Sequence, residues 1–155
     1  MKKLAVAAAT LVATLAQPVG AVTFPTLTTI YVGTGVKDDN ASTNTGVATA
    51  FHCSNVSGVT ATVRFLVLTG NGSIATSSPI TVLSGSTVAV STHFTLLYNE
   101  DLNLGTGIVN EGVVNIESTQ SGVFCNAKTI DASTAVPNGI TLPLVRVNPH
   151  PGTVE

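Results

Sequence analysis

The chain has 155 residues, of which 44% are hydrophobic and only 9% are charged, with a formal net charge of −2. Charged residues average about 25% of a soluble protein, and a disordered chain would combine low hydrophobicity with high charge, so intrinsic disorder is excluded. The six basic residues form no cluster that could neutralise a nucleic-acid backbone, and no nucleic-acid partner is expected.

The N-terminus has the pattern of a secretory signal peptide. Lys2 and Lys3 form a basic start, residues 4–16 form an apolar run, and residues 19–21 (Val-Gly-Ala) offer a small-residue cleavage signal. The apolar run is too short to span a bilayer, and no later run is long enough, so the mature chain is not expected to insert into a membrane. The sequence predicts a signal peptide over 1–21 and a secreted domain over 22–155, extracellular or periplasmic, with a leader typical of bacteria.

Period-two alternation of apolar and polar residues dominates the mature chain. In 62–68, for example, Val63, Phe65 and Val67 share one face, and Thr62, Arg64, Leu66 and Leu68 share the other. Val, Ile, Thr and Phe are abundant in such runs, as is typical of strands. The pattern predicts strands over 25–33, 46–54, 59–69, 73–83, 86–94, 111–118, 122–130 and 139–147.

Turn residues separate these runs, which favours a single antiparallel β-sandwich of seven or eight strands. Asn71-Gly72 is a strong hairpin signal, and glycine-containing turns follow at the other boundaries. Pro143 cannot donate to a strand ladder, so the last run is expected to be an edge or bulged strand. In the run 86–94, Val88, Val90 and Phe94 are expected on one face and His93 on the other.

Two polar, turn-rich segments, 33–46 and 96–110, are expected to be long surface loops, where function often resides. Asp101 and Asn103 place oxygen ligands at alternate positions, as at the start of a calcium loop, and Asp38 and Asp39 could add carboxylates from the other loop. The sequence therefore nominates a Ca²⁺ site at these four residues. The alternative is a solvated loop with Asx-turns, which Asp and Asn favour without any metal.

The two cysteines, Cys53 and Cys125, are expected to form a disulfide. Both fall on core faces of predicted strands, and export favours oxidation. Adjacent strand residues point to opposite faces, so His52 faces away from Cys53 and is a poor base for a catalytic thiol. A structural zinc site would need four ligands, for which no suitable spacing exists. His52 and His93 are expected on outer faces, where the two imidazoles could approach each other.

The placement of the cysteines gives the chain a resemblance to bacterial immunoglobulin-like or fibronectin-like sandwiches. Cys53 lies in the second predicted strand and Cys125 in the penultimate one, as do the cysteines of the bridge between sheets in the immunoglobulin fold. The chain departs from antibody-type domains because it has no Trp, and Val123 stands where those domains have a corner tyrosine. The resemblance implies a fold but carries over no functional residue.

The sequence presents no catalytic constellation. It has no G-x-S-x-G elbow, P-loop or dinucleotide fingerprint, and its acidic residues are dispersed. The first hypothesis is therefore a non-enzymatic exported protein that acts by contact, in adhesion or in a surface or matrix structure. Its partner would be a protein or cell surface, or another copy of the chain through strand pairing by 22–33 or 140–155. The alternative is a secreted ligand-binding module with the calcium site; an enzyme is the third option.

Overall fold

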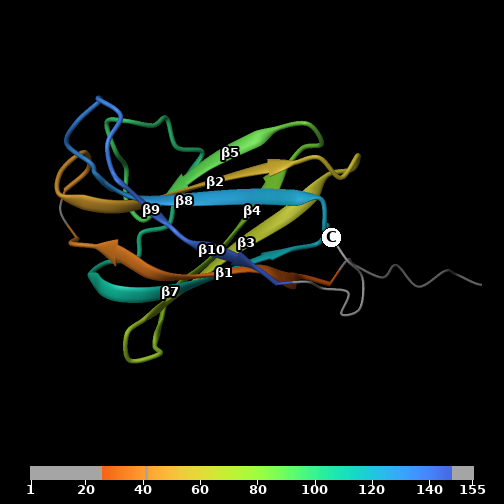
Figure 1. Cartoon of the computed structure of the whole chain (residues 1–155), viewed down its shortest axis with the longest axis horizontal. Coiled ribbons are helices and arrows are strands. Elements are labelled where there is room, and N and C mark those ends of the chain that lie inside the picture. The colour runs from red at the N-terminus through yellow and green to blue at the C-terminus, as the bar shows by residue number, and fades with distance from the viewer. Residues whose placement is uncertain (1–25, 41, 148–155) are drawn as a thin grey trace, which may run out of the picture.

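Two five-stranded β-sheets pack face to face in the computed structural model of the protein, which describes residues 26–40 and 42–147 (Figure 1). Sheet A contains, in spatial order, β10 (Leu144–Arg146), β1 (Thr28–Asp38), β7 (Val109–Ser118), β3 (Ala61–Thr69) and β4 (Ile74–Val82). Sheet B contains β6 (Leu102–Asn103), β5 (Thr87–Ser91), β2 (Val47–Asn55), β8 (Val123–Asp131) and β9 (Ile140–Leu142). The predicted signal peptide lies outside the described residues, and within them no helix is long and apolar enough to cross a membrane.

The all-β sandwich is confirmed, but the strand count and the purely antiparallel pairing are wrong. Ten strands are present among the described residues, because the predicted loop 96–110 contains β6 and the predicted strand 139–147 is divided in two. The short β6 runs parallel to β5, with Val90 opposite Leu102, so sheet B is mixed. A two-residue strand in a polar loop has too little alternation to be seen in a sequence.

Pro143 divides the final run between the two sheets. On its N-terminal side β9 pairs with β8 in sheet B, and on its C-terminal side β10 pairs with β1 in sheet A, both at sheet edges as expected for a proline-containing run. The segment thus crosses the open side of the sandwich (Figure 1). The leucines on either side of Pro143 pack closely over Gly33, where an added Cβ would lie 2.6 Å from Leu144 Cδ2.

The predicted loop 33–46 is partly a strand, because β1 continues to Asp38. The register of β1 against β7 shifts between Thr34 and Val36 and again between Val36 and Asp38, and Gly35 has a φ of 88°. These bulges break the period-two pattern, which is why the sequence suggested a loop. Val36 nevertheless lies fully buried in the core.

The core lies between the sheets and is built from the predicted inward faces. Phe51 of β2 and Phe65 of β3 meet there with ring centroids 5.5 Å apart, and Val63, Val67 and Ile116 are fully buried around them. The predicted strand 86–94 was wrong for its last three residues. Strand β5 stops at Ser91, so Phe94 is 39% exposed and His93 is buried.

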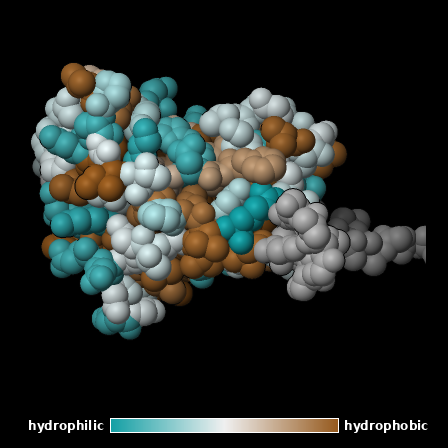
Figure 2. All heavy atoms as spheres, viewed as in Figure 1, coloured by the Kyte–Doolittle hydropathy of each residue, from teal (hydrophilic) through white to brown (hydrophobic). Residues whose placement is uncertain are grey.

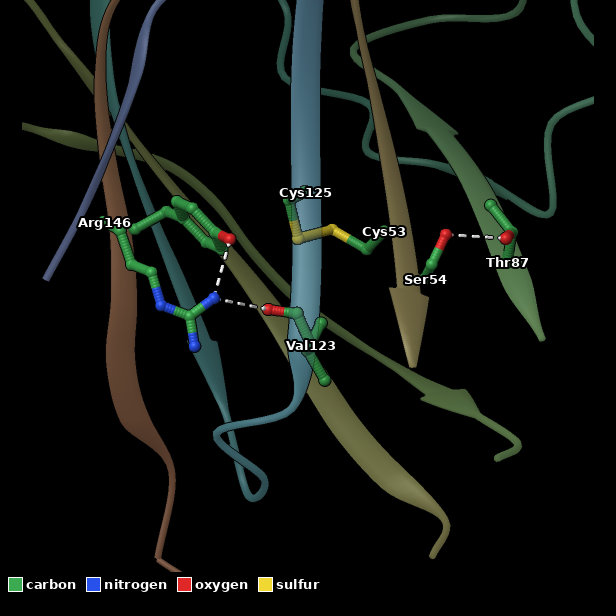
Figure 3. The surroundings of a disulfide bond; sticks show 7 residues. Cys53, Ser54, Thr87, Val123, Cys125 and Arg146 are labelled. Atoms are coloured by element: carbon green, nitrogen blue, oxygen red, sulfur yellow. Dashed lines mark hydrogen bonds between the residues drawn. A yellow bond between two sulfur atoms is a disulfide. The ribbon is translucent and has the colours of Figure 1, made fainter. Parts of the chain in front are cut away.

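The predicted disulfide is present and joins neighbouring strands of one sheet. Cys53 of β2 and Cys125 of β8 lie directly opposite each other, with Cα atoms 4.1 Å apart (Figure 3). The immunoglobulin bridge joins two sheets instead, so this pairing differs from the expected resemblance and an immunoglobulin-like topology is not shown. Cys53 is completely buried and His52 is partly exposed, which confirms that they face opposite sides of β2.

We expect the double variant Cys53→Ala/Cys125→Ala to lose about 4 kcal/mol of unfolding free energy, because the bridge closes a long loop in the unfolded chain. The sequence separation is 72 residues. Urea titrations of the oxidised wild type and the double variant measure the difference. A loss below about 1 kcal/mol would show that the bridge contributes little beyond the β2–β8 ladder.

Candidate functional site

The two loop regions that the sequence nominated meet at the carboxylate of Asp38. Asp38 is 1% exposed at the end of β1. Its Oδ1 atom lies 3.0 Å from Nδ1 of His93 and accepts the backbone N–H of Asn40 at 2.7 Å, while Oδ2 accepts the hydroxyl of Thr106 at 2.8 Å. Asp38 therefore joins β1 to the segment after β5 and to the segment before β7.

His93 closes this junction on its other side. Its Nε2 atom lies 2.9 Å from the carbonyl oxygen of Thr45, which can only accept, so Nε2 donates. Its Nδ1 faces the carboxylate of Asp38, and only 8% of the residue is exposed. Both ring nitrogens thus have protein partners. The expectation that His93 would lie on an outer face near His52 was wrong, because β5 ends before it.

A histidine, a carboxylate and a hydroxyl in contact resemble the parts of a nucleophilic triad, but their order is different. In such a triad the histidine lies between the hydroxyl and the carboxylate, so that one ring nitrogen takes the hydroxyl proton. Here the hydroxyl of Thr106 donates directly to Asp38, and Nε2 of His93 is bound to a carbonyl. These contacts hold the end of β1, the segment after β5 and the segment before β7 together. They leave neither ring nitrogen of His93 free to accept a substrate proton.

The ligand atoms of Asp38, Asp39 and His93 lie within 4.8 Å of one another. They already have protein partners, since Oδ2 of Asp39 accepts the backbone N–H of Val47 at 2.9 Å. No buried side-chain nitrogen or oxygen lacks a partner in the described part of the chain, so none points to a missing ion. The structure brings Asp38 and Asp39 together, and a calcium site there stays a prediction.

Asp101 and Asn103, the other two calcium candidates, bind the backbone around them. Oδ2 of Asp101 accepts the N–H of Ala89 at 2.8 Å, and Oδ1 of Asn103 accepts that of Gly105 at 2.8 Å. Asp101 is not part of the carboxylate and histidine cluster at Asp38. The contact of Asn103 is that of the Asx-turn alternative, and the contact of Asp101 holds the start of β6 beside β5.

The segment from Thr92 to Asp101 folds over the outer face of sheet B. Leu97 and Tyr98 pack there against a second hydrophobic cluster, separate from the main core. Glu100 holds the segment in shape, because its Oε1 accepts both the N–H and the hydroxyl of Thr95. The side chains below the segment are small or aliphatic: Ala48, Ala50, Ile130 and Ala132.

The covering segment also changes the environment of His52. The rings of His52 and Tyr98 meet edge to face with centroids 4.4 Å apart. Burial lowers the pKa of His52 below its usual 6.5, and the nearby positive charge of Lys128 lowers it further. A hydrogen bond to Asn126 and the charge of Glu100 act in the opposite direction but are weaker. His52 is therefore a neutral packing residue at pH 7.

The outer face of sheet A has no comparable cover among the described residues. No buried hydrophobic cluster like the one on sheet B forms there within the described part of the chain. Strand pairing arranges its side chains in rows across the sheet. One row runs from Val145 through Val32, Asn115 and Leu66 to Ser77, and the next runs from Thr34 through Val113 and Leu68 to Ile74. We call these two rows, with the adjacent row of Glu117, Arg64 and Pro79, the outer A face. Figure 2 shows its β10 side, where hydrophobic residues gather over β10 and β1.

The outer A face is predominantly apolar and locally neutral. Val145 and Ile74 are each 67% exposed, and Val32, Leu66, Leu68 and Val113 are partly exposed. The charged side chains within its three rows, Arg64 and Glu117, form an ion pair with each other across β3 and β7. The exposed Glu111, two residues before Val113 on β7, borders the face and adds one negative charge there. The sequence placed Leu66 and Leu68 opposite the core face, but alternation could not tell whether a loop would cover them. The sequence feature that could have indicated an uncovered apolar face was the large size of these two leucine side chains.

Arg146 forms another set of polar contacts, towards the N-terminal end of β1. Its guanidinium donates to the hydroxyl of Tyr31 and to the carbonyl oxygen of Val123 (Figure 3). It also donates to the carbonyl oxygen of Ser121 and lies 4.7 Å from the ring centroid of Phe124. Arg146 therefore ties β10 to β8 across the edge of the sandwich.

Comparisons of the chain with family models, with curated proteins and with solved structures found no match.

We expect Asp38→Ala to destabilise the fold by about 3 kcal/mol or more, because it leaves buried His93 without its carboxylate partner. Thr106→Val is the matched control. It removes one neutral donor to the same carboxylate and should cost about 1 kcal/mol. Chemical denaturation measures both, and equal costs would contradict the central place of the Asp38–His93 contact.

A second expectation concerns His52. The folded state favours the neutral ring of His52. The contribution of His52 to the unfolding free energy is therefore present above pH 6.5, and it is lost as the pH falls through the lower pKa of the folded state. In Tyr98→Ala the ring is more exposed, and the pKa should rise towards 6.5. NMR titration of the imidazole measures both values. A wild-type pKa at or above 6.5 would show that the segment does not cover His52.

Proposed function

We propose that the chain is an exported, non-catalytic β-sandwich that acts by contact, as a structural or adhesive component at a cell surface or in its matrix. The observation that carries the proposal is the outer A face, on which six apolar side chains lie in adjacent rows. Ile74 and Val145 are exposed, and the other four are partly exposed: Val32, Leu66, Leu68 and Val113. Contiguous exposed apolar surface of this kind is typical of interaction sites.

The polar chemistry of the chain supports a binding role over a catalytic one. Both cysteines are joined in the disulfide, and both ring nitrogens of His93 are occupied. The basic residues Lys37, Arg64, Lys128 and Arg146 come from four different strands, and Arg64 is paired, so they offer no continuous surface for nucleic acid. The disulfide is typical of an oxidising compartment, which agrees with the secretory leader pattern.

Contact through the outer A face is favoured over strand donation by the termini. The described parts of the two segments that could donate a strand are already paired, 28–33 within β1, and 140–142 and 144–146 within β9 and β10. The long edge strand β4 has Pro79, which lacks an N–H, and a register shift beside Ile74. Prolines and bulges discourage pairing at an edge. The face remains available without opening either sheet.

The test follows the tagged protein in cells that export it. We expect the wild type to be retained in the surface or matrix fraction and the variant Leu66→Glu/Leu68→Glu to be released into the soluble fraction, because two carboxylates oppose burial of the face. Leu96→Glu is the matched control, since Leu96 is 49% exposed on the segment that covers sheet B. Circular dichroism and melting curves confirm that all three proteins fold.

Retention of the face variant at the wild-type level would contradict the proposal that this face makes the contact. A wild type found entirely in the soluble fraction would contradict the structural or adhesive role itself.

A further inference from the structure

The outer side of sheet A, with the outer A face at its centre, is large enough for a stable protein interface. Strands β1, β7, β3 and β4 each have nine to eleven residues. With strands about 4.8 Å apart and a rise of about 3.3 Å per residue, they cover a planar footprint of about 20 by 30 Å. That is roughly 600 Å², at the lower end of the about 600–1,000 Å² that each partner buries in a specific interface.

The charge distribution selects the kind of partner. On the outer A face, Arg64 and Glu117 neutralise each other. Elsewhere the described residues carry three basic and six acidic side chains, a net charge of −3 with neutral histidines. Two copies of the chain would repel each other over most of their surfaces, but not where one neutral face meets another. A strongly charged partner would gain nothing from the face.

The centre of the face is suited to two-fold symmetry. Strand β7 is the middle strand of sheet A, and Asn115 is the middle residue of the row that runs from Val145 to Ser77. When a face packs on its own copy about a two-fold axis, its centre lies opposite itself. The amide of Asn115 carries both donors and acceptors, so it can bond to the same amide of a second copy.

We propose that the outer A face binds a second copy of this chain, with Asn115 near the two-fold axis. This inference rests on the proposed contact function and names the partner. Sheet B faces outward in such a dimer, with its covering segment from Thr92 to Asp101 on the outside. A dimer of this kind presents two identical outer surfaces, as a building block of a surface or matrix structure would.

The first test measures the molar mass of the oxidised mature chain, residues 22–155, by light scattering after size exclusion. We expect twice the mass of one chain. Leu66→Glu should weaken dimerisation by about tenfold or more, since it places an unpaired carboxylate in the interface. Leu96→Glu, on the opposite side of the sandwich, should leave the dimer unchanged. Melting curves show that each variant is folded.

The second test uses a single added cysteine, because both native cysteines are in the disulfide. We expect Asn115→Cys to form a covalent dimer under mild oxidation. Asn126→Cys, at an exposed position of β8 in sheet B, is the matched control and should remain uncrosslinked. This test also reports on dimers that dissociate during chromatography.

A wild type that stays monomeric and an Asn115→Cys variant that does not crosslink would together overturn the inference. A dimer that persists in Leu66→Glu would also overturn it, since the copies would then meet elsewhere. These outcomes differ from failure of the contact function, which is measured by retention in cells. A monomer whose retention still depends on Leu66 and Leu68 would indicate that the face binds a different protein.

Discussion

The buried contact between Asp38 and His93 is the constraint on which the arrangement of the loops depends. It holds the end of β1, the segment after β5 and the segment before β7 at one point, with every polar atom satisfied. A carboxylate is kept at such a depth only where partners compensate for lost hydration. Because His93 is fixed there, the chain that follows it is directed across sheet B rather than into solvent.

The two outer faces differ as a consequence. Sheet B has alanines at 48, 50 and 132, and these small side chains leave room for the segment that carries Leu97 and Tyr98. Sheet A has larger aliphatic side chains on its outer face, such as Leu66 and Leu68, and no described segment reaches them. One face is thus covered by the chain itself, and the other has no such cover among the described residues. The proposed contact function and the proposed dimer both rest on this asymmetry.

The sequence predicted the fold class, the disulfide and most strands, because alternation directly reports a face buried against a core, as at Val63, Phe65 and Val67. It failed where local geometry breaks the period: at the bulges around Gly35, at the sheet switch of Pro143 and at the end of β5. Asp38 and His93 are separated by 55 positions in the sequence, and no local pattern predicts the contact between them. The uncovered face could not be predicted either, since cover is a tertiary property.

The asymmetry of the two faces can be measured in solution by following methyl resonances of the mature chain as it is diluted. The account predicts that the methyl groups of Leu66, Leu68 and Val113 shift with concentration, because a second copy leaves the outer A face. Those of Leu97 and Ala48 should stay constant, because their cover belongs to the same chain. Constant resonances on sheet A, or concentration-dependent shifts confined to sheet B, would contradict the account.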